Sequence, residues 1–223
     1  IALTPMQLAN AMCIIANKGY YYTPHFVKSI GNNPKDTLLN PYLKRHNVTH
    51  IPDTTFNIIA QGMQDVVDHG TGTVAKLDGI DICAKTGTVE NKAVVNGQAM
   101  KMQNHSVFVA FAPRQDPKIA IAVIVENAGY GATWAGPVAS LMMEKYLKDS
   151  ISSKRKYLED KMYNANLISK YTYIIDSARR LKDQLRMQRK AELKRMEDST
   201  AHAHDSIMIT RWLKRTYLSK KNK

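Results

Sequence analysis

Two segments near the start of the chain repeat hydrophobic residues with the spacing of an amphipathic helix. The first follows Thr4-Pro5-Met6-Gln7, which forms a capping box with proline at the first helical position. The second is expected to be capped by Asp53. Their apolar positions are Leu8, Ala11, Met12 and Ile15 in the first segment and Phe56, Ile59, Met63 and Val66 in the second. The sequence therefore predicts two helices, with a strand within residues 20–30 and a loop over residues 31–51.

Three apolar runs in the middle of the chain predict strands. They comprise residues 80–84, 106–112 and 119–125. The last two runs are joined by residues 113–117, a short turn-rich connection, and are expected to be antiparallel neighbours. Residues 89–104 are polar and are expected to form a hairpin or a loop. A further amphipathic helix follows, with apolar positions at Val138, Leu141, Met142 and Tyr146. This order predicts an α+β fold in which helices flank an antiparallel sheet.

Positive charge is concentrated towards the C-terminal end of the chain, whose net charge is +13. Residues 1–148 carry 13 Lys and Arg against 10 Asp and Glu, whereas residues 149–223 carry 19 against 9. This shift predicts a domain boundary near Lys148. A polar break at residues 199–205 is expected to precede a short basic helix over residues 207–218. An amphipathic helix is predicted before that break from apolar residues at heptad-like spacing, namely Leu167, Tyr171, Ile174, Ala178, Leu181 and Leu185.

The basic, mainly helical extension over residues 149–223 has two interpretations. It is a solvated extension whose apolar stripe packs on the domain or on itself, or it attaches the protein to an acidic partner such as a membrane surface. The residues that favour attachment are Arg179, Arg180, Arg186, Arg189, Lys190, Lys194 and Arg195. The charge alone is also compatible with nucleic acid.

The remaining composition excludes several classes of protein. No apolar run approaches the roughly 20 residues that span a membrane. Two cysteines, Cys13 and Cys83, do not make a disulfide framework and are expected to be buried thiols. The histidines lack metal-ligand spacing, so no metal site and no cofactor are expected. The chain opens on Ile1 without an initiator Met, and we expect it to be a piece of a longer protein.

The motif Lys85-Thr86-Gly87-Thr88 is the candidate functional site. It follows the apolar run over residues 80–84, so we expect it at the end of a core strand. A Lys-Thr-Gly tripeptide is one signature of serine acyltransferases that bind penicillin, but on its own it is a weak signal. Other segments in order around it strengthen the signal. They are Leu3-Thr4-Pro5-Met6-Gln7-Leu8-Ala9-Asn10-Ala11, Ile15-Ala16-Asn17-Lys18-Gly19, Gly70-Thr71-Gly72-Thr73, Asn104-His105-Ser106, Phe111-Ala112-Pro113 and Val125-Glu126-Asn127.

Together these segments resemble the C-terminal part of the transpeptidase domain of class B penicillin-binding proteins, above all the penicillin-binding protein 2 branch, over residues 1–148. The resemblance implies a serine D,D-transpeptidase that cross-links peptidoglycan stem peptides ending in D-Ala-D-Ala and binds β-lactam antibiotics. It implies that Lys85 and the hydroxyls of Thr86 and Thr88 bind the substrate carboxylate. It also implies that Gly87 lets the substrate lie against the strand, and that the backbone N–H of Thr88 is an oxyanion donor.

The family's two other signatures do not precede the motif. The one Ser-x-x-Lys match, Ser153-Lys154-Arg155-Lys156, lies in the charged extension and is interpreted as accidental, and no Ser-x-Asn occurs. We therefore expect this chain to supply the Lys-Thr-Gly strand but not the nucleophile, and not to be acylated by penicillin by itself. Two alternatives share the pattern: a catalytically incomplete interaction module, and a β-lactam sensor or β-lactamase-like domain.

The resemblance also bears on location and partners. It implies the periplasmic side of the inner membrane, with a membrane anchor upstream. It favours partners such as a membrane surface or cell-elongation proteins, and it disfavours nucleic acid.

Overall fold

The computed structural model describes residues 3–48, 50–95, 98–168, 173, 176–196, 208 and 211. The chain divides into two compact units, Ile1–Leu167 and Ile168–Lys223. The boundary predicted near Lys148 rests on composition and stays a prediction. The first compact unit continues past that position, because the helix α5 (Lys156–Tyr163) packs on the helix α4 (Ala135–Lys148).

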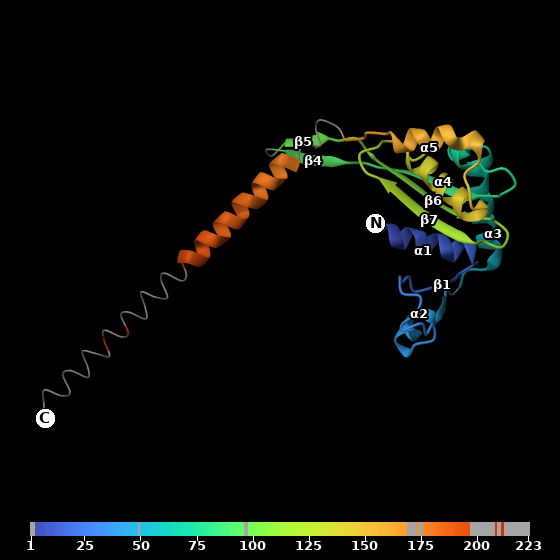
Figure 1. The fold of residues 1–223 in the computed structure, drawn as a ribbon, viewed down its shortest axis with the longest axis horizontal. Helices are drawn as coiled ribbons and strands as arrows, with labels where there is room; N and C mark the ends of the chain where they lie inside the picture. Colours follow the sequence, from blue (N-terminus) through green and yellow to red (C-terminus); the bar gives the residue numbers. More distant parts are fainter. Residues whose placement is uncertain are drawn as a thin grey trace, which may run out of the picture. The chain divides into compact units, whose positions relative to one another are not determined.

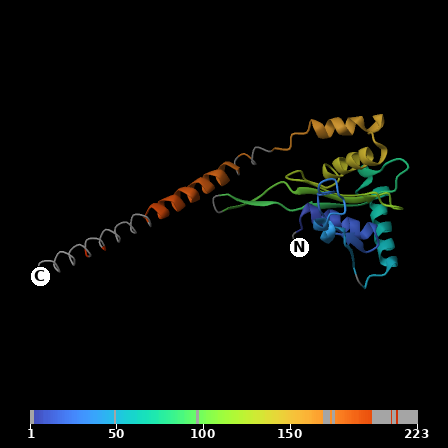
Figure 2. The ribbon, with the colours of Figure 1, turned by 60° about the horizontal axis from the view of Figure 1, so that its bottom comes forward.

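The first unit is built in three layers around an antiparallel sheet. Its strands are β3 (Cys83–Val89), β6 (His105–Ala112) and β7 (Ile119–Val125), in the order β3-β6-β7. The helices α1 (Pro5–Ala16) and α3 (Asp53–Asp68) pack against one face, and α4 covers the other. Figures 1 and 2 show α1 on one side of the sheet and α4 with α5 on the opposite side. The predicted α+β fold, with helices on both faces of an antiparallel sheet, is confirmed.

Alternate residues along the strands pack into two separate hydrophobic cores, one on each face of the sheet. Towards α1 and α3, Cys83, Val109 and Phe111 pack with Met12 and Met63. On the opposite face the buried strand residues Ala84, Phe108 and Ala110 pack against α4 through Ala135, Ala139 and Met143. Since neighbouring residues in a strand point to opposite faces, each strand is anchored from both sides. Burying one large apolar side chain of this kind contributes roughly 1.5–3 kcal/mol.

The capping box predicted for the first helix is present. Thr4 Oγ1 accepts a hydrogen bond from the Gln7 backbone N–H at 3.3 Å, and Gln7 Oε1 accepts one from the Thr4 N–H at 2.8 Å. The predicted cap of the second helix was wrong. Pro52 occupies the N-cap of α3 and makes no side-chain capping bond, while Asp53 is the first helical residue. There its negative charge still interacts favourably with the positive end of the helix dipole.

The prediction of a loop over residues 31–51 was also wrong. The segment contains the 3₁₀ helix η1 (Thr37–Leu39), the short helix α2 (Asn40–Leu43) and the strand β2 (Arg45–Asn47). β2 pairs antiparallel with β1 (Tyr20–Tyr22), the strand predicted within residues 20–30. Aromatic contacts hold this pair, because the Arg45 guanidinium lies 4.0 Å from the centre of the Tyr20 ring and the Tyr21 and His46 rings stack.

The predicted hairpin after Thr88 is present. β4 (Lys92–Val95) pairs antiparallel with β5 (Gln98–Lys101). The antiparallel pairing of β6 and β7 is confirmed as well, with Phe108 opposite Val123. The first predicted strand begins later than expected, at Cys83, and residues 80–82 precede it.

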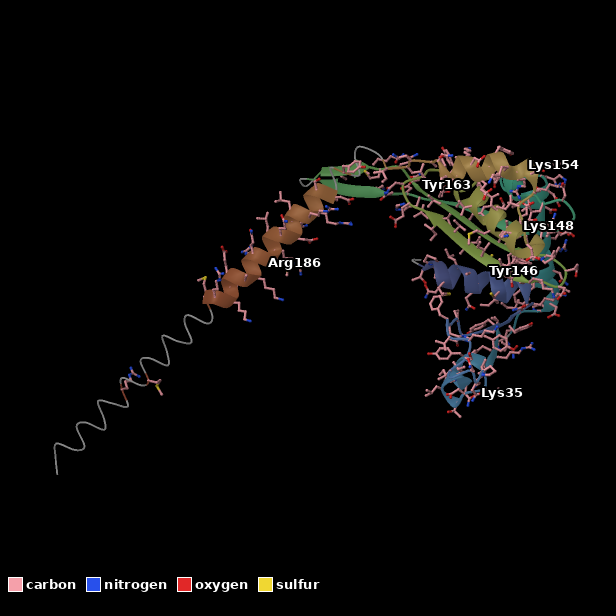
Figure 3. All side chains as sticks on the ribbon, viewed as in Figure 1. Lys35, Tyr146, Lys148, Lys154, Tyr163 and Arg186 are labelled. Carbon is pink, nitrogen blue, oxygen red and sulfur yellow. The ribbon has the colours of Figure 1, made fainter. Side chains whose placement is uncertain are left out.

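In the second unit the described residues 176–196 form one helix. All of its described side chains except Ala178 are exposed, and Figure 3 shows them projecting around it, with Arg186 labelled. The helix predicted from Leu167 does not begin there, because residues 164–168 are not helical. Tyr171, Ile174 and the break at residues 199–205 lie outside the described residues, as does most of the last predicted helix. Within the described part of the chain, no helix combines the length and the apolar character needed to cross a membrane.

Candidate active site

The motif Lys85-Thr86-Gly87-Thr88 lies inside β3 and not after its end. β3 pairs with β6, so that Thr86 is opposite Phe108 and Thr88 is opposite Ser106. Among the described residues β3 is an edge strand of its sheet. Lys85 and Thr88 are exposed, and Thr86 and Gly87 are half-buried. The motif therefore lies in the C-terminal part of a core strand, as expected, and the strand continues through it because a polar segment can extend an edge strand where one side faces solvent.

The alternation of β3 divides the motif between two faces. Lys85 and Gly87 share the face of Cys83, whereas Thr86 and Thr88 share the face of Ala84. The Lys85 Nζ folds back and donates a hydrogen bond to the Thr86 carbonyl at 2.7 Å. This places the ammonium group at the strand edge. Because backbone groups of alternate residues point the same way in an antiparallel ladder, the N–H of Thr88 shares the direction of the Thr86 carbonyl.

A turn that precedes β3 touches the motif directly. Thr71 Oγ1 lies 2.8 Å from Thr86 Oγ1, within hydrogen-bonding distance. The turn lies in Gly70-Thr71-Gly72-Thr73, one of the segments that carry the family resemblance. The 3₁₀ helix η2 (Thr73–Ala75) does start there, but the turn also places a hydroxyl on the site.

The loop between β7 and α4 also packs on the motif, on the sheet face that carries Thr86 and Thr88. A Cβ at Gly131 would lie 2.3 Å from the Val107 carbonyl oxygen and 2.7 Å from that of Gly87. Only glycine fits so close to two strand backbones. The buried Ser106 hydroxyl fixes this loop, since its Oγ donates to the Tyr130 carbonyl at 2.8 Å and accepts from the Ala135 N–H at 3.0 Å.

Sequence reasoning missed Gly131 and Ser106 as site residues. A lone serine in an otherwise apolar strand was the one available signal for Ser106, and it pointed to a buried hydrogen bond without naming the partner.

A polar network links the start of β6 and the residues that follow β3 and β7. The Asn127 N–H donates to His105 Nδ1 at 3.1 Å, and the Asn91 side chain donates to Asn127 Oδ1 at 2.6 Å. Asn127 has a left-handed φ of 54°. His105 therefore orients the loop that carries Gly131.

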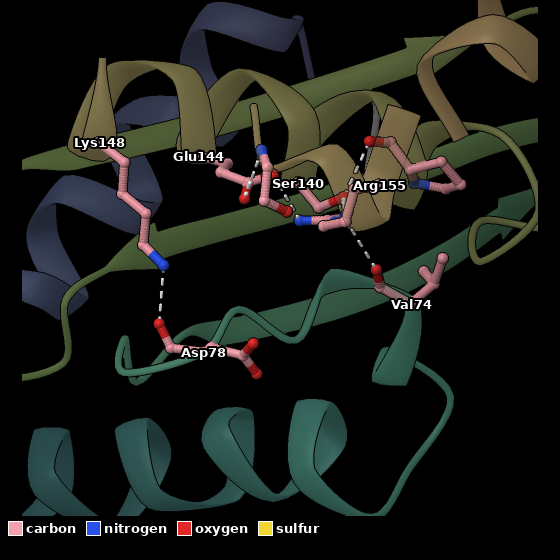
Figure 4. A network of polar contacts seen from close by, with 8 residues as sticks. Val74, Asp78, Ser140, Glu144, Lys148 and Arg155 are labelled. Carbon is pink, nitrogen blue, oxygen red and sulfur yellow. Dashed lines mark hydrogen bonds and ion pairs between the residues drawn. The ribbon is translucent and has the colours of Figure 1, made fainter. Parts of the chain in front are cut away.

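A buried ion pair joins α4 to the segment that follows it. Glu144 is 2% exposed, and Arg155 Nη1 lies 3.2 Å from its Oε2. The guanidinium also donates to Ser140 Oγ at 2.6 Å and to the Val74 carbonyl at 3.4 Å. Figure 4 shows this cluster, together with the hydrogen bond from Lys148 to the Asp78 carbonyl. Arg155 thus joins the segment after α4 to the turn that leads into β3.

The formal Ser-x-x-Lys match falls in this same segment. Ser153 begins the 3₁₀ helix η3 (Ser153–Arg155), and Lys156 begins α5. Lys156 pairs with Glu159 at 2.7 Å. Arg155, which lies between them, is part of the cluster around Glu144, so this stretch has a structural role.

The two cysteines are free thiols. Burial raises the pKa of Cys83 to about 12, and it raises the pKa of the half-buried Cys13 in the same direction. Cys83 Sγ donates to the Ala60 carbonyl at 3.3 Å. Cys83 was predicted to be buried, and it is; Cys13 is only partly so.

Chemically, the described site can bind an anion and can donate hydrogen bonds from an edge strand. It combines a lysine ammonium group, two hydroxyls on one strand face and the open edge of β3. Neither a nucleophilic serine beside Lys85 nor a group of three or more metal-ligating side chains is found among the described residues.

Comparison with known proteins places this geometry in context. The family described as the penicillin binding protein transpeptidase domain matches residues 1–144. Peptidoglycan D,D-transpeptidase MrdA of Haemophilus influenzae is 32% identical over 167 residues, which are 69% of this chain and 25% of the relative. Stage V sporulation protein D of Bacillus subtilis is 30% identical over 174 residues, 74% of this chain and 26% of the relative. The chain thus spans about a quarter of the length of the curated relatives it matches.

Solved structures give the same result. Pseudomonas aeruginosa PBP2 in complex with WCK 5153 superposes with a TM-score of 0.53 at 28% identity, covering 68% of this chain and 32% of that one. Penicillin-binding protein A from M. tuberculosis, solved as an imipenem acyl-enzyme complex, gives 0.52 at 28% identity and covers 66% and 32%. The resemblance of the motif segments therefore extends to the fold.

Proposed function

The chain belongs to the penicillin-binding protein transpeptidase family, and on that premise we propose that it supplies the substrate-binding strand of a serine D,D-transpeptidase that cross-links peptidoglycan. The substrate is a stem peptide ending in D-Ala-D-Ala, and β-lactams occupy the same place. A serine outside this chain attacks the D-Ala-D-Ala peptide bond and forms an ester, and the terminal D-Ala leaves with a proton on its amine. An amine of a stem peptide on a neighbouring peptidoglycan strand then takes the acyl group, and the serine is regenerated.

The residues of β3 have distinct parts in this reaction. The Lys85 ammonium rotates from the Thr86 carbonyl to the terminal carboxylate of the substrate, a movement that a flexible lysine stem permits. The hydroxyls of Thr86 and Thr88 donate to the same carboxylate, and bonds to a charged group are the stronger kind. Gly87 lets the substrate lie along the edge as an added strand. The N–H of Thr88 points towards that edge and stabilises the developing oxyanion.

The observation that best supports this proposal is the edge of β3. A cationic side chain and two hydroxyls belong to one short segment of a strand that lacks a neighbour on one edge among the described residues. Carboxylate recognition needs the cation and the hydroxyls, and strand addition needs the open strand edge.

The direct test uses the longer protein that contains this chain. We expect it to be labelled by a fluorescent penicillin and to release D-Ala from a peptide ending in D-Ala-D-Ala. The chain 1–223 alone, treated in the same way, is expected to remain unlabelled because it does not bring a serine to Lys85. Stoichiometric labelling of the chain alone would contradict the assignment of the nucleophile, and absence of labelling of the longer protein would contradict the proposed function.

A second role is favoured by the helix over residues 176–196. It carries eight Lys and Arg against three Asp and Glu, and its leucines Leu181 and Leu185 are 58% and 56% exposed. A helix with this charge and with uncovered leucines fits an anionic membrane surface. We infer that the second unit attaches the protein to anionic lipid. Binding to vesicles that contain anionic lipid, but not to neutral vesicles, and its loss at high salt would support this role.

The proposed substrate also sets the location. Peptidoglycan is cross-linked outside the inner membrane, so the enzyme acts on the periplasmic side, with an anchor in sequence that precedes this chain. The cationic helix would then meet the outer leaflet of that membrane. Accessibility of Lys85 to a membrane-impermeant amine reagent in intact spheroplasts tests this location.

A further inference from the structure

The turn before β3 brings a hydroxyl to the substrate-binding strand that the proposed roles do not use. Thr71 Oγ1 lies 2.8 Å from Thr86 Oγ1, and both side chains are at the surface of the site. A hydroxyl carries one proton and can accept further hydrogen bonds. If Thr86 donates its proton to a substrate carboxylate, the bond between the two threonines must be donated by Thr71.

Several contacts hold the turn that presents Thr71. The Gly70 and Gly72 N–H groups both donate to the Val66 carbonyl, at 3.2 and 2.9 Å. A Cβ at Gly70 would lie 2.9 Å from Val66 Cα, and one at Gly72 would lie 3.0 Å from Val66 Cγ1. The two glycines therefore allow the chain to fold tightly onto the end of α3. This close packing fixes the position of the threonine between them.

The turn is also held from its C-terminal side. The Ala75 N–H donates to the Gly72 carbonyl at 2.9 Å, and the half-buried Arg155 guanidinium donates to the Val74 carbonyl at 3.4 Å. A Cβ at Gly136 of α4 would lie 3.0 Å from Val74 Cγ1. The turn is thus anchored to α3, to α4 and to the segment after α4. A hydroxyl on such a support keeps its place while a substrate exchanges on β3.

We propose that Thr71 is a positioning residue for carboxylate binding: it donates a hydrogen bond to Thr86 Oγ1 and so directs the single Thr86 proton to the carboxylate of the acyl donor. This rests on the proposed function, because it assumes that Thr86 meets that carboxylate. Hydrogen bonds in series polarise one another, so the bond from Thr71 also makes Thr86 a stronger donor.

The expected effect is on binding of the acyl donor and not on the chemical step. The carboxylate is bound in the ground state and in the transition state alike, so losing the Thr71 hydroxyl weakens both equally. We expect Thr71→Val in the longer protein to raise the dissociation constant of the non-covalent penicillin complex about fivefold. The acylation rate constant at saturation stays within about twofold of the parent value.

Two matched variants separate this role from simple packing. Thr71→Ser keeps a hydroxyl at the same position and is expected to restore binding to within about twofold of the parent. Thr73→Val makes the same exchange two residues along, at an exposed threonine of the same turn, and is expected to leave both constants unchanged. Thermal unfolding of each variant checks that the fold is retained.

The experiment is stopped-flow acylation of the longer protein and its variants by benzylpenicillin over a range of concentrations. An unchanged dissociation constant for Thr71→Val overturns the proposal, as does an equal loss in Thr71→Ser. A fall of the acylation rate constant as large as the change in binding overturns it too. Failure of the parent protein to be acylated would instead refute the proposed function, so the two failures are distinguishable.

Discussion

The edge of β3 and the helix over residues 176–196 both carry positive charge, but they hold it in different ways. At β3 a single lysine sits on a strand that is clamped by two neighbours, the loop of Gly131 and the turn of Thr71. On the helix, eight basic residues project into solvent. At the strand the electrostatic effect therefore depends on the position of one ammonium group. On the helix it is the sum of the fields of many basic side chains.

This difference predicts how each region responds to substitution. Single changes in the clamped region should have large effects that depend on geometry. Changes on the helix should have small effects that add together and fall with salt. The following predictions test the contrast in order of decreasing effect.

The largest effect is expected at Gly131. In Gly131→Ala the new Cβ cannot remain 2.3 Å from the Val107 carbonyl oxygen, so the loop or the strand must move. A displacement of about 1 Å at a site can cost about 100-fold in rate, and we expect a loss of that order in penicillin acylation of the longer protein.

Gly62→Ala in α3 is the matched control, because a Cβ there would meet nothing within 4 Å. It should leave acylation unchanged and stabilise the helix by up to about 1 kcal/mol. Parent-like acylation of Gly131→Ala would show that the loop does not set the position of β3.

The next effect is expected at the buried ion pair. Arg155→Met leaves Glu144 buried without its partner, and breaking such a pair costs about 3–5 kcal/mol of unfolding free energy. Lys156→Met, next to it, removes an exposed pair with Glu159 and should change stability little.

Denaturant unfolding followed by fluorescence compares these two variants with the parent. The double variant Arg155→Met with Glu144→Leu should regain part of the loss, since no charge is then left buried. Equal stability of the Arg155 and Lys156 variants would mean that the segment after α4 is not tied to the first unit by this cluster.

A smaller effect concerns the thiol of the site strand. Burial raises the pKa of Cys83 to about 12, above its ordinary value of 9.0, so the folded protein retains the proton that the unfolded chain loses. The resulting stabilisation is complete below pH 9 and is lost as the pH rises from about 9 to about 12.

Alkylation measures this protection. At pH 8.5 iodoacetamide should modify the half-buried Cys13 before Cys83, because the thiolate is the reactive form. Mass spectrometry of the digested protein identifies the modified residue. Faster modification of Cys83 would indicate that β3 opens away from α3 in solution.

The smallest single effects are expected on the helix. Arg186→Gln or Arg189→Gln alone should change the unfolding free energy by less than about 0.5 kcal/mol, as is usual for exposed positions. Binding to anionic vesicles should fall by about 1 kcal/mol for each removed charge. Co-sedimentation at several salt concentrations measures this. Complete loss of binding from one substitution would indicate a specific site in place of a summed field.

Much of the fold could be predicted because its main elements are long and periodic. The helices α1, α3 and α4 show the helical spacing of apolar residues, and β7 was predicted at its observed limits. The elements that were missed within residues 31–51 are η1, α2 and β2, which have three, four and three residues, too few to show a period. β2 is stabilised by ring contacts to β1, which only the folded chain brings together.

The candidate site was predicted in part for a similar reason. Lys85-Thr86-Gly87-Thr88 is a local motif that can be read in the sequence. Its supports come from residues distant in the chain: Thr71 lies 15 positions before Thr86, and the hydrogen bond from Ser106 reaches Tyr130, 24 positions on. Composition also counted Arg155 among the charges of the basic extension, although it is buried against Glu144. Contacts between residues distant in the sequence decide such roles, and the periodicity of apolar residues does not reveal those contacts.

Acylation of the longer protein by benzylpenicillin, compared between the parent and Lys85→Met, tests the central claim that the edge of β3 binds the substrate carboxylate. Lys92→Met on β4 serves as the control for loss of one exposed lysine. We predict a fall in acylation efficiency of about 10-fold to 100-fold for Lys85→Met, with unchanged thermal stability and no effect of Lys92→Met. Equal acylation of the parent and Lys85→Met would contradict the account.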